Sequence, residues 1–256
     1  MKPLFFQSIR WRVQLWHGLL LILITSVLLA GFYRYEWRVR LQTLDQELTG
    51  LAALCAAVDL PVNADFEAGF AEAPEDVAAN VRLAIETGVA GLSIEDTKPG
   101  GVDLYDQPFA VERIRAARAA IDASGQDVIL VARTEGLLSE AGALHTAIDK
   151  LVAFAGAGAD CLYAPGVQTR DDIAVMVRAV APKPLNVLMT RPGLSVSELA
   201  GLGVRRISVG GALARVAWGA VEAAARQIQD GSFAGLAGAA SGKTLNGIFE
   251  SFRKEA

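Results

Sequence analysis

Short apolar runs rich in β-branched residues alternate with longer amphipathic segments from residue 59 to the C-terminus. Apolar runs of roughly four to eight residues are typical of buried strands, and apolar residues three or four apart are typical of helices. Strands are predicted at 61–66, 90–95, 127–133, 160–164, 185–189 and 205–209. Helices are predicted between and after them, near 74–88, 108–123, 140–157, 169–181, 195–202 and 212–229. Strands that alternate with helices form βα units around a parallel sheet.

The number of these units sets the expected fold class. A closed (β/α)8 barrel of the TIM type has eight βα units, and about six are visible here. Prolines at helix starts and glycines at helix ends agree with the predicted boundaries, as at Pro74, Pro108 and Gly125. We therefore expect an α/β domain over residues 51–256, built as a partial TIM-type barrel.

The N-terminal region has a different pattern. No Asp, Glu, Lys or Arg occurs from Val13 to Tyr33, and a helix of that length rises about 30 Å, the thickness of a hydrocarbon core. Aromatic residues flank the run, as they do at membrane interfaces: Trp11, Trp16, Tyr33, Tyr35 and Trp37. We expect a single-pass transmembrane helix and hence a membrane location, with an orientation that the flanking charges leave undetermined. A cleaved signal peptide and a buried core helix are the alternatives.

A helical pattern continues after the apolar run. Leu44, Leu48, Leu51 and Leu54 recur three to four residues apart and form one apolar stripe within residues 34–57. No Gly-, Pro- or Ser-rich linker separates this segment from the run before it. The chain is therefore expected to divide into residues 1–50, a membrane-spanning and juxtamembrane helix, and residues 51–256, the barrel.

Composition narrows the class of partners. Hydrophobic residues make up 52% of the 256 residues, enough for a substantial core, and the net charge is −4. A net negative charge argues against nucleic acid as a partner. The two cysteines, Cys55 and Cys161, have no metal-binding spacing, and a reducing compartment is the simpler interpretation.

Charged residues follow three consecutive predicted strands. Asp65 and Glu67 end the first, Glu95 ends the second, and Arg133 and Glu135 end the third. The carboxyl ends of parallel strands share one face, where active sites of barrels and α/β sheets are built. Carboxylate oxygens beside a guanidinium suit a divalent metal and an anionic substrate. The alternative is an internal ion-pair network without catalysis.

These segments resemble the isocitrate lyase and phosphoenolpyruvate mutase superfamily over residues 52–250. The likeness rests on motifs in the family's order: Asp65-Phe66-Glu67 with Ala68-Gly69-Phe70, Ile94-Glu95-Asp96, Val131-Ala132-Arg133-Thr134-Glu135, Asp160-Cys161-Leu162-Tyr163-Ala164-Pro165-Gly166 and Ile207-Ser208-Val209-Gly210-Gly211. The resemblance implies a barrel that starts here at the family's third strand, in the cytoplasm. Residues 1–50 resemble, less closely, the start of a bacterial sensor histidine kinase.

The resemblance implies an Mg²⁺-dependent enzyme, with Mn²⁺ as an alternative ion. Such an enzyme acts on a small α-keto acid or enol phosphate and makes or breaks a C–C or P–C bond next to an enolate. By position, Asp65, Glu67 and Glu95 match the family's metal-site acids. Arg133 matches the arginine that binds the substrate carboxylate, and Glu95 and Arg133 are the expected catalytic residues. The chemistry agrees, because a metal ion stabilises an enolate oxygen as a Lewis acid.

The loop after Glu95 departs from one branch of the superfamily. Isocitrate and methylisocitrate lyases carry a catalytic cysteine there, in a Lys-Lys-Cys-Gly-His run, whereas residues 96–103 contain no cysteine. A cysteine-dependent lyase is therefore disfavoured. The oxaloacetate decarboxylase, phosphonate hydrolase and mutase branches remain.

Four further residues are expected to bind substrate. Tyr163 and Asn186 end later strands and line either the pocket or the core. Gly210 and Gly211 lie in a turn that resembles a backbone anion-binding turn before the last helix, although close helix packing explains the same glycines.

Three function classes follow from these observations. The first is a membrane-tethered lyase or mutase of this superfamily, acting on a small keto acid. The second is a catalytically inert membrane-anchored fusion product or ligand-binding module, because a partial barrel lacks part of the site. A sensor module that reads ligand binding through the membrane helix is a third. Open sheet edges need a cover, which a partner chain or residues 34–57 could supply, and we expect a homo-oligomer.

Overall fold

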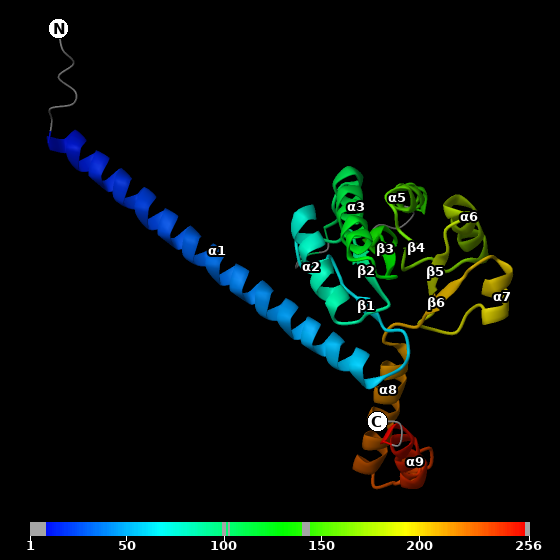
Figure 1. The fold of residues 1–256 in the computed structure, drawn as a ribbon. Coiled ribbons are helices and arrows are strands. Elements are labelled where there is room, and N and C mark those ends of the chain that lie inside the picture. The colour runs from blue at the N-terminus through cyan, green and yellow to red at the C-terminus, as the bar shows by residue number, and fades with distance from the viewer. Residues whose placement is uncertain (1–8, 99–100, 102, 140–143, 254–256) are drawn as a thin grey trace.

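The computed structural model describes residues 9–98, 101, 103–139 and 144–253. Its centre is one sheet of six strands, all parallel and hydrogen-bonded in sequence order. The strands are β1 (Asn63–Asp65), β2 (Gly91–Glu95), β3 (Ile129–Arg133), β4 (Cys161–Tyr163), β5 (Leu185–Leu188) and β6 (Arg206–Ser208). The sheet forms a half-barrel of the TIM type, so the predicted α/β class and partial barrel are confirmed (Figure 1).

Helices follow the strands as the sequence predicts. They are α2 (Pro74–Glu86), α3 (Gln107–Ser124), α5 (Leu144–Gly156), α6 (Arg170–Val180), α7 (Val196–Gly201) and α8 (Ala212–Gln229). Three elements were not predicted: the short α4 (Gly136–Ser139), the 3-10 helix η2 (Ala234–Leu236) and α9 (Gly242–Arg253). Local signals fix several ends. Asp106 caps α3 by accepting from the Phe109 amide, and Gly125 ends it with φ +68°.

The core lies between the sheet and the layer of helices α2, α3, α5 and α6 (Figure 1). Along β2 and β3, alternate residues such as Leu92, Ile94 and Leu130 enter this core and are fully buried. Each such side chain contributes about 1.5–3 kcal/mol by leaving water. The residues between them therefore point to the opposite, inner face of the half-barrel.

The first helix, α1 (Ile9–Ala57), is one continuous helix of 49 residues. Leu44 and Leu51 are buried and belong to the main core, so the predicted stripe packs on the barrel. Residues 21–29 are exposed. The proposed domain division at residue 50 falls inside this helix and stays a prediction.

The predicted transmembrane helix at 13–33 is wrong, and with it the membrane location and the membrane as a partner. Over the residues that the structure describes, no helix is long and apolar enough to span a bilayer. The helix that contains the apolar run instead continues through charged residues from Arg34 to Glu47 and ends against the barrel.

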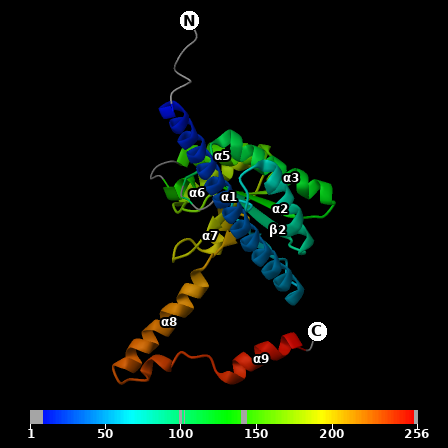
Figure 2. The same cartoon turned by 90° about the vertical axis from the view of Figure 1, so that its left-hand side faces the viewer.

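The C-terminal helices extend away from the half-barrel. Figures 1 and 2 show α8 leaving the β6 edge of the sheet and α9 lying beyond it. None of the residues of α8 is buried. Large apolar side chains along it are exposed, among them Leu213, Val216 and Trp218.

Candidate active site

One lateral row of residues crosses the sheet near the carboxyl ends of its strands. The parallel register aligns Glu95 with Arg133, Arg133 with Tyr163, and Tyr163 with Asn186. Asp65 is aligned with Ser93, one pleat behind Glu95, and its carboxylate accepts a hydrogen bond of 3.0 Å from the Ser93 hydroxyl. Because side chains alternate across a strand, these residues all project from the inner face. Five chain segments thus converge on one surface.

Arg133 is the centre of this row. Its Nε lies 3.2 Å from Glu95 Oε2 and also pairs with Glu135, and its Nη1 lies 3.3 Å from Asp65 Oδ2. The guanidinium also lies over the Tyr163 ring, 5.1 Å from the ring centroid. Burial alone would lower the pKa of Arg133, but Glu135, Glu95 and Asp65 raise it above its usual value. Arg133 therefore stays charged in this setting.

Three carboxylates surround this single cation, and the excess of negative charge falls on Glu95. Burial raises the pKa of Glu95 from 4.5 to about 7; Arg133 opposes the rise, whereas Glu135 and Asp65 add to it. A carboxyl with a pKa near neutrality exchanges a proton at physiological pH, as catalytic acids and bases do. The Glu95 side chain is 15% exposed, so solvent and small molecules reach it.

The remaining predicted residues differ in their access to the row. Tyr163 is buried, and burial raises its pKa. Asn186 is fully buried, and its amide donates to the Ser208 hydroxyl at 2.9 Å. Gly210 has φ +49°, and Gly211 is the residue before the first turn of α8. Their roles in substrate binding stay predictions.

Glu67 is not part of the cluster around Arg133. Its side chain is exposed and, within the described residues, makes no hydrogen bond or ion pair. Its backbone carbonyl accepts from the Glu95 amide at 2.9 Å, and its φ of +46° is unusual for a residue other than glycine. Glu67 is therefore linked to Glu95 through the backbone.

Sequence reasoning missed a buried ion pair behind the row. Asp96 is buried, and its carboxylate accepts from Lys150 Nζ at 2.6 Å, from the Thr134 hydroxyl at 2.7 Å and from the Glu135 amide at 2.9 Å. This carboxylate fixes the backbone on which Glu135 approaches Arg133. Lys150 comes from α5, and only its position on an otherwise buried helix face could have signalled the contact.

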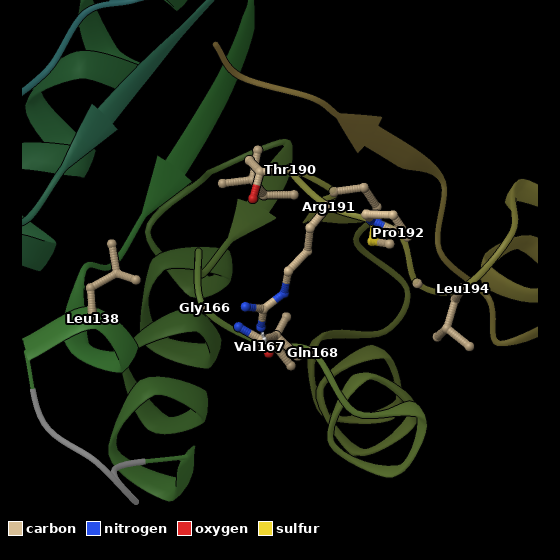
Figure 3. A pocket seen from close by; sticks show the side chains of 11 residues that line it. Leu138, Gly166, Val167, Gln168, Thr190, Arg191, Pro192 and Leu194 are labelled. Atoms are coloured by element: carbon tan, nitrogen blue, oxygen red, sulfur yellow. Dashed lines mark hydrogen bonds between the residues drawn. The ribbon is translucent and has the colours of Figure 1, made fainter. Parts of the chain in front are cut away.

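A pocket of about 250 Å³ lies at the ends of β4 and β5. Its wall includes Leu138 of α4 and Leu188 at the end of β5. Figure 3 shows Arg191 reaching across the pocket toward Gln168, to whose side chain it donates a hydrogen bond. Leu188 also packs against the cluster that contains Tyr163, so the pocket adjoins the row around Arg133.

The fit of a metal ion rests on these same donors. Among the described residues, no group of three or more His, Cys, Asp or Glu side chains is arranged to hold a metal ion. The predicted trio of Asp65, Glu67 and Glu95 is therefore not gathered into one set of ligands. Mg²⁺, however, retains several waters and is held by one or two carboxylates in many enzymes. Hard oxygen donors with excess negative charge, as at Asp65 and Glu95, fit an ion bound in that way.

The family model of phosphoenolpyruvate phosphomutase matches residues 22–229. The chain belongs to this family. The resemblance to the isocitrate lyase and phosphoenolpyruvate mutase superfamily is thereby confirmed. The match begins within the apolar run of residues 13–33, so the family's own domain includes the second half of that run. These comparisons give no support to the likeness of residues 1–50 to a sensor histidine kinase.

Related proteins of this superfamily carry several activities in their names. An uncharacterized protein of Mycobacterium tuberculosis H37Rv is 30% identical over 182 residues, 71% of this chain and 66% of its own length. The 2-methylisocitrate lyase of Escherichia coli K12 is 33% identical over 48% of this chain and 43% of its own. The chain thus spans less than two thirds of these relatives. Other matches are named oxaloacetate decarboxylase and oxaloacetate acetylhydrolase, so the branch is not decided.

Solved structures give the same fold. A crystal structure of a candidate lyase/mutase from Burkholderia cenocepacia J2315 has a TM-score of 0.76 and 46% identity, covering 80% of this chain and 75% of the other. The half-barrel is thus similar to most of a known superfamily structure.

Proposed function

We propose that this protein is an Mg²⁺-dependent lyase or mutase that acts on a small α-keto acid or enol phosphate through an enolate. The observation that carries the proposal is the position of Arg133, held among three carboxylates on the inner face at the carboxyl ends of the strands. This is the edge on which barrel enzymes build their active sites. Mn²⁺ is an alternative ion.

Asp65 and Glu95 are the residues that would hold the ion, with Glu67 close to them through its backbone contact with Glu95. A bound divalent ion supplies Lewis acidity that stabilises an enolate oxygen. A carboxylate that held the ion would pair less closely with Arg133. The contacts of Asp65 with Arg133, at 3.3–3.4 Å, are long, and this carboxylate is 69% exposed, so it is the easiest of the three to redirect.

Once released from part of its pairing, Arg133 binds the substrate carboxylate. Its planar guanidinium makes two parallel hydrogen bonds to such a group, which fixes the orientation of the adjacent keto carbon. The Tyr163 ring lies against the guanidinium, 5.1 Å from Cζ to the ring centroid, and supports it from one side. In the metal-free protein the pKa of Glu95 is raised, so Glu95 holds a proton near neutral pH and would release it on binding the ion.

The branches that we favour are oxaloacetate decarboxylase, phosphonate hydrolase and mutase, over the cysteine-dependent lyases. The support is the sequence of the loop after Glu95, where residues 96–103 lack the cysteine of the cysteine-dependent lyases. The adjoining pocket of about 250 Å³ suits a small substrate.

A second candidate function is an inert or ligand-binding module. The specific observation in its favour is that Arg133 is already paired with three acids, as in a structural ion-pair network. The two functions differ in their response to a metal ion. Added Mg²⁺ should raise the thermal midpoint of an enzyme site by mass action and leave an inert network unchanged.

The experiment that tests the proposal is decarboxylation of oxaloacetate by the full chain, followed with and without Mg²⁺ and compared with Arg133→Met. Activity that needs the metal and disappears in the variant supports the enzyme. The absence of both turnover and an Mg²⁺-dependent midpoint shift would contradict it.

We also propose that the protein is a homo-oligomer. The exposed apolar side chains of α8, including Leu213, Val216 and Trp218, support a face that another copy covers. Size-exclusion chromatography with light scattering measures the mass directly. Trp218→Ser should shift the protein toward the monomer, and a monomeric wild type would remove the proposal.

A further inference from the structure

Arg113 is a buried arginine on α3 whose bonds go to backbone carbonyls. The residue is 1% exposed. Its Nε donates to the Glu72 carbonyl at 3.1 Å, its Nη2 to the Ala71 carbonyl at 2.8 Å and also to the Ala68 carbonyl, and its Nη1 to the Glu95 carbonyl at 3.1 Å. The guanidinium lies 4.5 Å from the centroid of the Tyr105 ring.

These bonds join two segments that are distant in sequence. Three of the carbonyls belong to the loop after β1, and the fourth belongs to Glu95 at the end of β2. The rigid fork of a guanidinium holds its acceptors in fixed relative positions. Arg113 therefore ties the loop to Glu95 from behind the inner face, in addition to the backbone bond from the Glu95 amide to the Glu67 carbonyl.

The loop that Arg113 holds is strained. Glu67 has φ +46° and Phe70 has φ +53°, values that residues other than glycine adopt at an energetic cost. Such conformations persist only where the surroundings hold them, and they cluster at functional sites. The three loop carbonyls that Arg113 binds, from Ala68 to Glu72, lie immediately after Glu67 and around Phe70.

We propose that Arg113 is a positioning residue for the candidate metal site: it holds the loop that follows Asp65 and Glu67 against the carbonyl of Glu95, so that Asp65 and Glu95 can share one ion. The inference rests on the proposed function. Residues behind a metal site that orient its ligands typically change metal affinity by about 10- to 100-fold when replaced. Arg113 does not touch the ion or the substrate in this assignment.

Arg118 on the same helix provides a matched control. It is also a partly buried arginine, and it pairs with Asp160 at 2.8 Å, whose carboxylate accepts from the Leu130 amide. These contacts lie at the amino end of the sheet, away from the acids. Arg113→Lys and Arg118→Lys both keep the charge and both remove a forked set of bonds, but only the first concerns the candidate site.

The experiment measures Mg²⁺ affinity by calorimetry on the full chain, together with the thermal midpoint of each metal-free variant. Arg113→Lys is expected to weaken Mg²⁺ binding by about 10-fold or more, and Arg118→Lys by less than about 2-fold, even where both lower the midpoint. Equal Mg²⁺ affinity in Arg113→Lys and the wild type would overturn the positioning role, as would equal losses in both variants.

A measurement on the wild type covers the case in which Arg113→Lys does not fold. The Nε resonances of Arg113 and Arg118 are followed by nitrogen NMR during an Mg²⁺ titration. A shift at Arg113 alone supports the assignment, and no shift at Arg113 in a protein that binds Mg²⁺ refutes it. A wild type that binds no Mg²⁺ in calorimetry refutes the proposed metal site itself, and the positioning role with it.

Discussion

Two layers of charge lie at the carboxyl ends of β1, β2 and β3, and they are built differently. The front layer, around Arg133, pairs one cation with three partly exposed carboxylates. The back layer contains Arg113, bonded to neutral carbonyls, and Lys150, bonded to the buried Asp96. The back layer contains two cations and one carboxylate, whereas the front layer contains one cation and three carboxylates. The back layer therefore fixes geometry, whereas the front layer has negative charge available for a ligand.

The largest expected effect is in the back layer. Lys150→Met leaves the Asp96 carboxylate buried without its cation, and breaking such a pair costs about 3–5 kcal/mol of unfolding free energy. Urea unfolding of the metal-free protein measures it. Lys183→Met is the control, because Lys183 is partly exposed and 3.9 Å from Asp160, and it should cost well under 1 kcal/mol. If Lys150→Met and Lys183→Met lost the same unfolding free energy, the assignment of a structural role to the back layer would be contradicted.

The front layer should show its effect as a dependence on pH. The folded-state pKa of Glu95, about 7, is above its usual 4.5, so the folded state holds this proton more tightly than the unfolded state. The stabilisation that the bound Glu95 proton gives the folded state is complete below about pH 4.5 and is lost as the pH rises to about 7. The unfolding free energy falls by about 3 kcal/mol over this range, at about 1.36 kcal/mol per pH unit. Urea unfolding of the metal-free protein at pH 5 and pH 8 measures it.

Glu95→Gln should remove most of that pH dependence and also abolish the midpoint shift caused by Mg²⁺. The control is Glu222→Gln on α8, whose partner is Arg226 on the exposed surface, and it should behave as the wild type. If Glu95→Gln kept the wild-type dependence on pH, the excess charge would have to lie on another group.

The smallest expected change in stability is at Asp65. Asp65→Asn removes an exposed ion pair with Arg133, which should change the unfolding free energy by about 1 kcal/mol or less. The same variant should weaken Mg²⁺ binding measurably, because a proposed ligand is lost. Asp122→Asn is the control, since Asp122 is 66% exposed and also pairs with an arginine. If Asp65→Asn bound Mg²⁺ as tightly as the Asp122→Asn control, Asp65 would not be a ligand of the ion.

The sequence was sufficient to place the strands and the row of site residues. Period-two alternation fixes that Glu95 and Arg133 point away from Leu92 and Leu130, and parallel pairing brings the strand ends together. It could not give the contacts that depend on packing over long separations. Lys150 reaches Asp96 from helix α5. The Glu135 amide donates to the same Asp96 carboxylate, which places Glu135 near Arg133.

The N-terminal helix shows a different limit of sequence reasoning. An apolar run of suitable length has the same pattern whether it crosses a bilayer or belongs to a long helix of a folded domain. The buried contacts of Leu44 and Leu51 with the barrel, well beyond the run, could not be read from periodicity alone. The exposed helix α9 was missed because its apolar residues follow a glycine-rich stretch that suggests a tail.

The lateral alignment of Glu95, Arg133 and Tyr163 has a consequence for how the chain reaches its native state. A slip of β3 by one residue would place Ala132 opposite Glu95 in place of Arg133. The guanidinium would then point into the hydrophobic core behind the sheet. A sheet paired in that register would bury an unpaired cation and would be less stable than the native sheet. The side chain that we assign to substrate binding thus also disfavours the wrong strand register.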